Sequence, residues 1–377
     1  MAKKLKFPRV QDVVGFMNRV APPALAESWD NVGLQLGDSA MEVRRLLVAL
    51  DPEDCVIEEA IAREATLIVS HHPLILRPLQ GVVASEGTGR RLLRAAQAGT
   101  AIFCAHTNLD RARGGLNDWL AQALELQDVA VLQQGNDDEL FKLVVFVPSG
   151  HEEQVSDAIF QAGAGNIGEY DQCSFRAEGT GTFCPGAAAN PFIGEIGRRE
   201  AVSELRLETV VPREYLTRVL QKMLKAHPYE EPAYDLIPLR NRRSDVGLGR
   251  IGRLSEALSL DKFARQVAQG LGTEKVRVVG SVDRTVSRVA VCGGSGASLI
   301  GEAVRQGADV LVTGDIKYHE ARQAQEKDLC LVDAGHFASE RVMVARLAQV
   351  LRDEADNQGW NIEILEAQGE SEPFRFV

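Results

Sequence analysis

Short apolar runs alternate with amphipathic stretches through roughly the first third of the chain. Three runs rich in apolar residues are typical of strands buried on both faces: Arg44–Leu50, Thr66–Ser70 and Thr100–Ala105. Helices are expected between them, over Pro52–Glu64, with proline at the first helical position, and over Gly89–Ala98, which Gly99 ends. Strands that alternate with helices pair in parallel, so this segment predicts an α/β sheet.

The same pattern returns after about Val246. The expected strands are Arg288–Cys292, Val310–Thr313 and Leu329–Val332. The expected helices are Leu299–Gln306, Lys317–Lys327 and Ala338–Gln358. Together the two flanking segments, 1–135 and 246–377, therefore predict one discontinuous α/β domain with a mostly parallel sheet flanked by helices.

The middle segment, residues 136–245, has a different order of elements. The expected strands are Lys142–Val147, Cys173–Ala177, Glu204–Val210 and Ala233–Pro238, and the expected helices are Glu152–Ala162 and Arg213–Ala226. This β-α-β-β-α-β order is that of a ferredoxin-like fold. We therefore expect an α+β domain inserted into a loop of the first.

Composition narrows the class of protein. The 377 residues are 45% hydrophobic and 25% charged, with a formal net charge of −11, which is the profile of a globular protein. The acidic balance makes nucleic-acid binding unlikely, and no apolar run is long enough to span a membrane. The basic start, Met1–Pro8, lacks an apolar signal core, and six scattered cysteines without a CxxC pair suit a reducing compartment. A cytoplasmic location is expected.

The chemically interesting polar residues directly follow predicted strands. Ser70 leads into His71 and His72, Ala105 leads into His106 with Asp110 four residues on, and Asp333 is soon followed by His336 with Glu340 one helical turn later. In open α/β sheets ligands collect beyond the carboxyl ends of strands, where such loops meet. We expect these side chains to form one site.

Three histidines and two acids without a thiolate suit zinc, iron, manganese, cobalt or nickel. The spacing of His336 and Glu340 puts both on one helix face. His71 and His72 can serve one site only if the chain turns there, as Pro73 allows, or if each binds a different ion. These residues are too many for one ion with an open position, and they fit two divalent metal ions that share a carboxylate.

Other stretches leave alternatives open. His106 is a ligand, an outer donor that orients Asp110, or a proton shuttle. His319 is expected to line the pocket or to stand behind a ligand, and not to bind the metal itself. The glycine-rich turn 292–298 either cradles a phosphate or carboxylate or is a tight strand-to-helix turn. The loop Glu27–Gly33 lines a pocket or is a capped turn, and the turn His227–Pro232 is expected to be structural.

A family resemblance follows from five motifs in order: Trp29–Gln35 (WDNVGLQ), Ser70–Leu74 (SHHPL), His106–Asp110 (HTNLD), Thr313–Asp315 with Tyr318 and His319, and Gly335–Glu340 (GHFASE). Together they resemble the NIF-three-like family, whose members are labelled GTP cyclohydrolase I type 2 homologues. The middle segment, with Gly163–Gly168 (GAGNIG) and the stretch 227–235 (HPYEEPAYD), resembles the extra domain of the long bacterial members.

The resemblance implies a dinuclear metal site with ligands His71, His72, Asp110, His336 and Glu340, the glutamate bridging. It also implies a toroidal homohexamer with its sites facing an interior cavity, and a PII- or CutA-like fold for the insert. The cyclohydrolase label is an inherited name that these residues do not themselves establish.

The leading functional hypothesis is a metal-dependent hydrolase, in which two ions activate water and His106 or His319 moves a proton. Its substrate would be a nucleotide or another phosphorylated molecule. The alternative is a metal-binding regulator or assembly scaffold without turnover, in which the insert serves as a sensor or as an interaction module.

Overall fold

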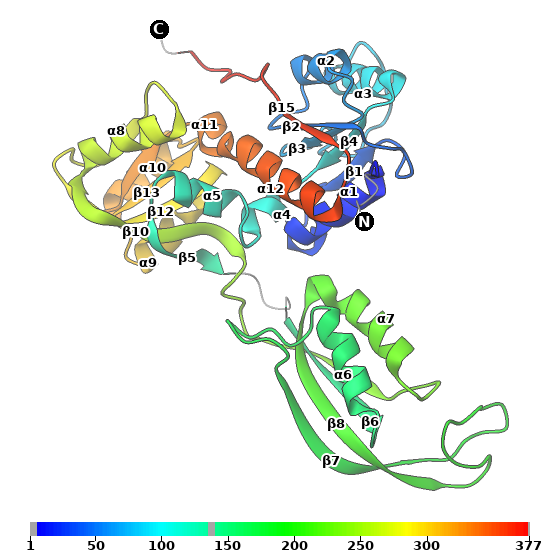
Figure 1. Ribbon diagram of the computed structural model, residues 1–377. Helices are drawn as coiled ribbons and strands as arrows, with labels where there is room; N and C mark the ends of the chain where they lie inside the picture. The colour runs from blue at the N-terminus through cyan, green and yellow to red at the C-terminus, as the bar shows by residue number, and fades with distance from the viewer. Residues whose placement is uncertain (1–5, 135–139, 376–377) are drawn as a thin grey trace. The chain divides into compact units, whose positions relative to one another are not determined.

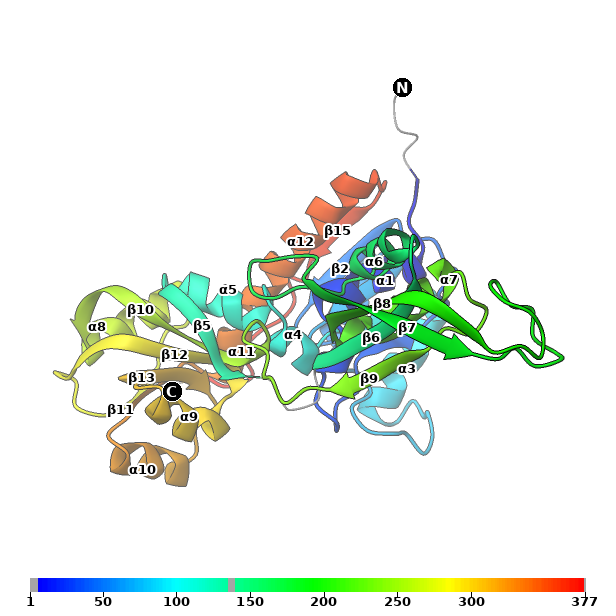
Figure 2. The same ribbon diagram turned by 90° about the horizontal axis from the view of Figure 1, so that it is seen from below.

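The computed structural model describes residues 6–134 and 140–375 (Figures 1 and 2). The chain divides into two compact units, Met1–Gln134 with Ser244–Val377, and Gly135–Arg243. The expected domain border at 135/136 and the first five residues of the basic start lie outside the described residues.

The first sheet of the larger unit has five strands in the order β1-β4-β3-β2-β15. Its strands are β1 (Gly33–Leu36), β2 (Arg45–Ala49), β3 (Leu67–Ser70), β4 (Ala101–Cys104) and β15 (Glu363–Glu366). Only β1 pairs antiparallel. Alternate residues of the parallel strands enter two cores. One core includes α1 (Val10–Val20) and α12 (Val342–Gln358), and the other includes α2 (Asp54–Ala62) and α3 (Gly87–Ala98).

The second sheet of this unit has six strands in the order β11-β14-β13-β12-β10-β5. They are β5 (Gln127–Gln134), β10 (Gly247–Ser259), β11 (Arg277–Val279), β12 (Thr285–Ser295), β13 (Val310–Gly314) and β14 (Cys330–Asp333). The three central strands are parallel, and the outer pairs are antiparallel. Its flanking helices are α5 (Leu116–Ala123), α8 (Leu260–Leu271), α9 (Ile300–Arg305) and α10 (Tyr318–Glu326).

The expected α/β class is confirmed, with differences in detail. The strands form two sheets where the sequence suggested one. Pro52 does not begin a helix, because α2 starts at Asp54 with Glu53 as its N-cap. The expected helix 338–358 is two helices, α11 (His336–Glu340) and α12, which Arg341 separates. α11 contacts β12 and β13, while α12 contacts β2 and β15 of the other sheet, so this helical stretch reaches from one sheet to the other.

Two short helices carry the polar residues between the sheets. α4 (Thr107–Arg111) begins three residues after β4 ends, and α11 begins three residues after β14 ends. α4 contacts β10 and α5, and α11 contacts β12 and α5, so both lie beside the second sheet. Short 3-10 turns complete this unit at Pro23–Leu25 and Ala297–Leu299. The strand ends of both sheets therefore deliver side chains to one region.

The smaller unit is an antiparallel sheet in the order β7-β8-β6-β9 with two helices. Its elements are β6 (Leu140–Pro148), α6 (Glu152–Gln161), β7 (Ser174–Phe183), β8 (Glu200–Pro212), the 3-10 turn Arg213–Tyr215, α7 (Leu216–Ala226) and β9 (Tyr234–Pro238). This order and pairing confirm the ferredoxin-like expectation. The finer PII- or CutA-like assignment stays a prediction.

Within the described residues, no helix is both long and apolar enough to cross a membrane.

Candidate metal centre

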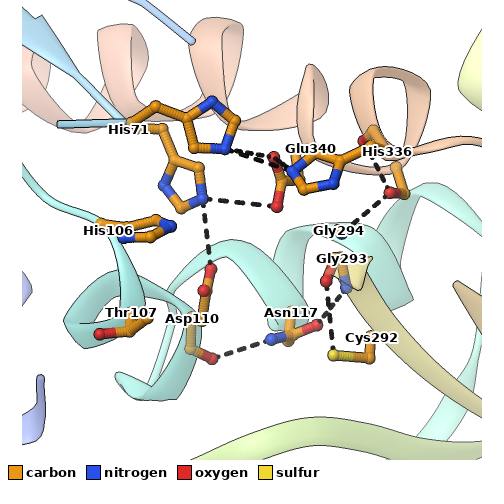
Figure 3. Close-up of polar contacts among 12 residues, drawn as sticks. His71, His106, Thr107, Asp110, Asn117, Cys292, Gly293, Gly294, His336 and Glu340 are labelled. Carbon is orange, nitrogen blue, oxygen red and sulfur yellow. Dashed lines mark hydrogen bonds and ion pairs between the residues drawn. The ribbon is translucent and has the colours of Figure 1, made fainter. Parts of the chain in front are cut away.

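The five expected site residues gather in one cluster, and Figure 3 labels four of them, His71, Asp110, His336 and Glu340. His71 and His72 follow β3, Asp110 lies on α4, and His336 and Glu340 lie on α11. The Glu340 carboxylate lies at the centre. Its Oε2 is 3.1 Å from Nε2 of His72 and 3.1 Å from Nε2 of His336, and its Oε1 is 3.6 Å from Nε2 of His71. Nε2 of His71 lies 3.5 Å from Oδ1 of Asp110.

The backbone bends after β3, and this bend lets adjacent histidines serve one site. The strand ends at Ser70, whose hydroxyl donates to the carbonyl of His72 at 2.8 Å. The two imidazole centroids lie 5.1 Å apart. The bend thus brings both imidazoles to the Glu340 carboxylate, His71 to its Oε1 and His72 to its Oε2.

Each imidazole is oriented through its Nδ1 atom. Nδ1 of His71 lies 2.9 Å from the carbonyl oxygen of Ala105, which can only accept, so Nδ1 carries the proton. The other three rings contact carboxylates: His72 with Asp51 at 2.7 Å, His336 with Asp315 at 2.7 Å and His106 with Asp30 at 2.9 Å. This outer contact is the usual one for a metal-binding histidine, whose Nε2 then faces the ion.

Three buried atoms of the cluster lack a hydrogen-bond partner within the described part of the chain: Nε2 of His71, Oδ1 of Asp110 and Oε2 of Glu340. Their neighbours lie at ion-pair distance, but without hydrogen-bond geometry. Unsatisfied buried polar atoms are costly, and a cation between them would remove that cost. These residues therefore fit a metal ion, and His72, His336 and Glu340 offer ligand atoms that all lie within 4.8 Å of one another.

A tight glycine turn makes room for Glu340. A Cβ atom on Gly294, whose φ is +59°, would lie 2.2 Å from Oε1 of Glu340. The N–H groups of this turn already bind side chains: Gly293 donates to Asn117, Gly294 to Ser339 and Gly296 to Thr313. The structure therefore favours the tight turn over the anion cradle.

Asp110 is held from the opposite side. The Asn117 side chain of α5 is fully buried, and it donates to the carbonyl of Asp110 at 2.9 Å. The same amide accepts the N–H of Gly293 at 2.9 Å. One buried amide thus ties the helix that carries Asp110 to the turn beneath Glu340 (Figure 3).

The electrostatics of the cluster favour bound positive charge. Burial alone would lower the pKa of His72, but its contacts with Asp51 and Glu340 raise it to about 10. Contact with Glu340, helped by Asp315, raises the pKa of His336 to about 9. Burial opposes ionisation of Glu340, yet the surrounding imidazoles, His71 first, hold its pKa well below its usual range. Without metal the site keeps protons, and a metal ion must displace them.

His106 also belongs to the cluster. One ring nitrogen each of His71, His72 and His106 lies within 4.8 Å of the other two. The Asp30 carboxylate contacts Nδ1 of His106 and accepts from the N–H and hydroxyl of Thr107. The loop 27–33 therefore positions His106. His319, in contrast, is exposed, and its ring contacts that of its neighbour Tyr318, so the structure gives no support for the expectation that it lines this pocket or stands behind a ligand.

The sequence analysis missed the carboxylates that orient the imidazoles. Asp51 was not singled out, and Asp315 was noted only as part of a motif. Both come directly after parallel strands, Asp51 two residues beyond β2 and Asp315 one residue beyond β13. A carboxylate that follows a strand at the same sheet edge as a histidine could have indicated that it orients the imidazole.

Comparisons with known proteins agree with this architecture. The family model described as Duf34/NIF3 (NGG1p interacting factor 3) matches residues 8–373. The chain belongs to the DUF34/NIF3 family. It is 42% identical over 373 residues to a Halalkalibacterium halodurans protein named "GTP cyclohydrolase 1 type 2 homolog", covering 99% of this chain and 100% of that protein. A Bacillus subtilis protein of the same name is 42% identical over 367 residues, covering 97% of this chain and 98% of that protein.

Solved structures of this family share the fold. The structure titled as a Bacillus cereus protein related to NIF3 superposes with a TM-score of 0.88 at 41% identity, covering 99% of this chain and 100% of that one. A Staphylococcus aureus protein superposes with a TM-score of 0.78 at 29% identity, again covering 99% and 100%. The DUF34/NIF3 assignment thus covers both flanking segments and the insert.

Proposed function

We propose that this DUF34/NIF3 protein binds two divalent metal ions through His71, His72, Asp110, His336 and Glu340. The position of the Glu340 carboxylate carries the proposal. Its Oε1 faces His71, and its Oε2 faces His72 and His336, so the two oxygens address different imidazoles. A carboxylate placed in this way suits a ligand shared by two ions. Imidazole and carboxylate together suit zinc, iron, manganese, cobalt or nickel.

With these ions bound, the protein would act as a hydrolase. Divalent ions make water a stronger nucleophile near neutral pH and polarise the oxygen of the bond to be cut. His106 supplies the proton-transfer group, since Asp30 holds its ring and one of its ring nitrogens lies within 4.8 Å of a ring nitrogen of His71 and of His72. Burial of His71 and Glu340 keeps bulk water from competing for the centre.

The class of substrate is proposed from the relatives. Their name refers to a nucleotide, GTP, and we extend the proposed substrate class to phosphorylated molecules in general. The glycine turn 292–298 no longer supports this choice, because its N–H groups at Gly293, Gly294 and Gly296 already bind side chains.

The test compares the parent protein with Glu340→Ala and with a control, Glu363→Ala. Glu363 lies on the edge strand β15 and pairs with Arg45 at the surface. Each protein is loaded with metal and assayed against GTP, other nucleotides and phosphate esters. Turnover by the parent and the control that is lost in Glu340→Ala, with both variants folded by circular dichroism, supports the hydrolase.

Absence of turnover together with metal-dependent binding of a partner would contradict the hydrolase proposal. If the metal-loaded parent turns over no substrate while a partner protein binds it only in the metal-loaded form, the hydrolase proposal is wrong. The protein would then be a metal-dependent regulator or scaffold.

A further inference from the structure

The inserted domain contains a cavity of about 700 Å³ that the proposed function does not use. It is lined by residues of β6, β7 and β8, by the loop between β7 and β8, and by the turn before β9. A volume of this size is ordinary for a site that binds a small molecule.

The cavity lies on the sheet face opposite the helices. Leu143, Val145 and Leu207 pack with α6 and α7 in the core of this domain. Because side chains alternate along a strand, Phe146 and Arg206 point to the other face, where they are direct partners in the β6–β8 pairing. A sheet of this kind needs only one face for its core. The second face is therefore free to form a site.

Aromatic rings form part of the wall. The Tyr229 ring centroid lies 5.8 Å from that of Phe183 and 6.4 Å from that of Phe192. Phe146 also lines the cavity, while Phe192 is 53% exposed. Aromatic faces of this kind hold apolar groups, and they also attract organic cations.

A buried carboxylate faces the same space. Glu204 is only 8% exposed and lines the cavity. It accepts a hydrogen bond from the Tyr229 hydroxyl at 3.0 Å, and burial together with this contact raises the pKa of Tyr229, which keeps its proton. Gly181 allows the approach, since a Cβ atom there would lie 2.1 Å from Oε2 of Glu204.

No lysine or arginine among the described residues forms an ion pair with Glu204. Arg206, on the same face of β8, pairs instead with Glu208 at 2.8 Å. Glu230 and Glu231 add further acidic groups to the lining, in which Arg206 is the basic residue. A buried carboxylate without a cation is costly, and this cost favours a positively charged occupant.

The turn 227–232 builds this wall. His227 is a neutral structural residue, because its Nδ1 accepts the N–H of Tyr229, and its Nε2 therefore donates to the carbonyl of Phe146. These two bonds place the Tyr229 ring over the cavity. The turn 227–232, which the sequence predicts to be structural, thus also positions residues that line the cavity.

We propose that the aromatic cavity around Glu204 and Tyr229 in the inserted domain binds a small organic cation, an ammonium or guanidinium group on an apolar body. The charged group contacts Glu204, and the apolar body lies against Phe183, Phe192 and Tyr229. This site is independent of the metal cluster.

The test uses calorimetric titration of the full-length protein with tryptamine, agmatine, spermidine and choline. Indole-3-acetate, which has the ring of tryptamine but a negative charge, is the ligand control. At least one cation is expected to bind with one site per chain at concentrations up to about 10 mM. Glu204→Gln should weaken that binding at least about tenfold, a loss typical of removing a charged partner.

The matched control variant is Glu153→Gln, which removes the same charge from α6 on the helix side of the sheet. It should bind as the parent does. Phe192→Ala gives a second measurement, and it should weaken cation binding without changing the circular dichroism spectrum.

Four results would overturn the proposal. The first is that none of the four cations binds the parent. The second is that indole-3-acetate binds as tightly as tryptamine. The third is that folded Glu204→Gln binds the cation unchanged. The fourth is that Phe192→Asp lowers the mass measured by light scattering, which would make the cavity a contact between copies of the chain.

Discussion

At the scale of single residues, the contacts behind the imidazoles matter as much as the atoms that face the centre. Asp51 and Asp315 each lie 2.7 Å from Nδ1 of a histidine, and they fix both the ring and its tautomer. A carboxylate in this position also makes the opposite nitrogen a better ligand. The metal affinity of the site should therefore depend on residues that never touch the ion.

Asp51→Asn tests this dependence. The amide keeps the shape of the side chain but loses its charge, and metal affinity should fall by about 10–100-fold. Competition with a fluorescent chelator measures the change. Asp54→Asn is the matched control, because Asp54 lies three residues away and pairs with Arg90 at the surface. Equal affinities of Asp51→Asn and the parent would show that Asp51 does not support His72.

At the scale of elements, the turn after β12 sets the position of Glu340 on α11. Gly294 combines a positive φ with close approach of the carboxylate, so any side chain there must displace Glu340 or strain the backbone. The two elements meet only in the folded chain, and local sequence carries no sign of the approach.

Gly294→Ala should therefore lower the bound metal by at least about tenfold while the protein remains folded, since its effect centres on one ligand. Gly301→Ala on α9 is the control, because its Cβ atom would meet nothing within 4 Å. That variant should keep its metal and be as stable as the parent or slightly more stable. Elemental analysis after dialysis measures the metal bound per chain. Full metal content in Gly294→Ala would contradict the claim that a side chain at this position displaces Glu340.

The segment after β15 gives stability a pH dependence. Glu370 accepts the N–H groups of Leu50 and Asp51 at the end of β2, and burial raises its pKa from 4.5 to about 7. The Glu370 carboxyl group therefore loses its proton at a lower pH in the unfolded chain than in the folded chain. The free energy of unfolding should fall by roughly 1 kcal/mol as pH rises from about 4.5 to about 7, after allowance for partial exposure.

Glu370→Gln should remove this pH dependence of the unfolding free energy, which chemical denaturation at several pH values measures. The amide oxygen still accepts hydrogen bonds, but the amide group cannot ionise. Glu372→Gln should keep this pH dependence, because Glu372, two residues on, is only half-buried and accepts the N–H of Phe374 instead. If the unfolding free energy of Glu370→Gln still falls between about pH 4.5 and about pH 7, other groups cause the pH dependence.

The elements differ in how far the sequence predicts them. Parallel strands such as Leu67–Ser70 were predicted because both faces are buried and the run is continuously apolar. β1 and β5 were missed, since edge strands with exposed positions leave no such run. The five central site residues were predicted from their places after strands. The pairing of Asp51 with His72 was not predicted from the sequence, because the geometry of the loops decides which carboxylate contacts which imidazole ring.

At the scale of the whole molecule, the homohexamer implied by the family resemblance remains a proposal. One surface loop supports it. Leu76, Leu79, Val82 and Val83 are each 40–47% exposed within eight residues of the loop between β3 and α3. An apolar group of this kind is typical of a surface that another protein covers.

Light scattering coupled to size-exclusion chromatography should give six times the chain mass of 41.1 kDa. A double variant, Val82→Glu with Val83→Glu, should lower that mass by weakening the subunit contact. A parent that elutes as a single chain at micromolar concentration would rule out the hexamer.

The account as a whole depends on the cluster around Glu340 holding a pair of cations. Elemental analysis of the purified protein, combined with anomalous scattering from its crystals, counts and locates those ions in one study. We expect two divalent ions per chain, both in contact with Glu340 and surrounded by His71, His72, Asp110 and His336. Protein that binds no divalent ion at these side chains, even after loading with each of the five candidate metals, would contradict the account.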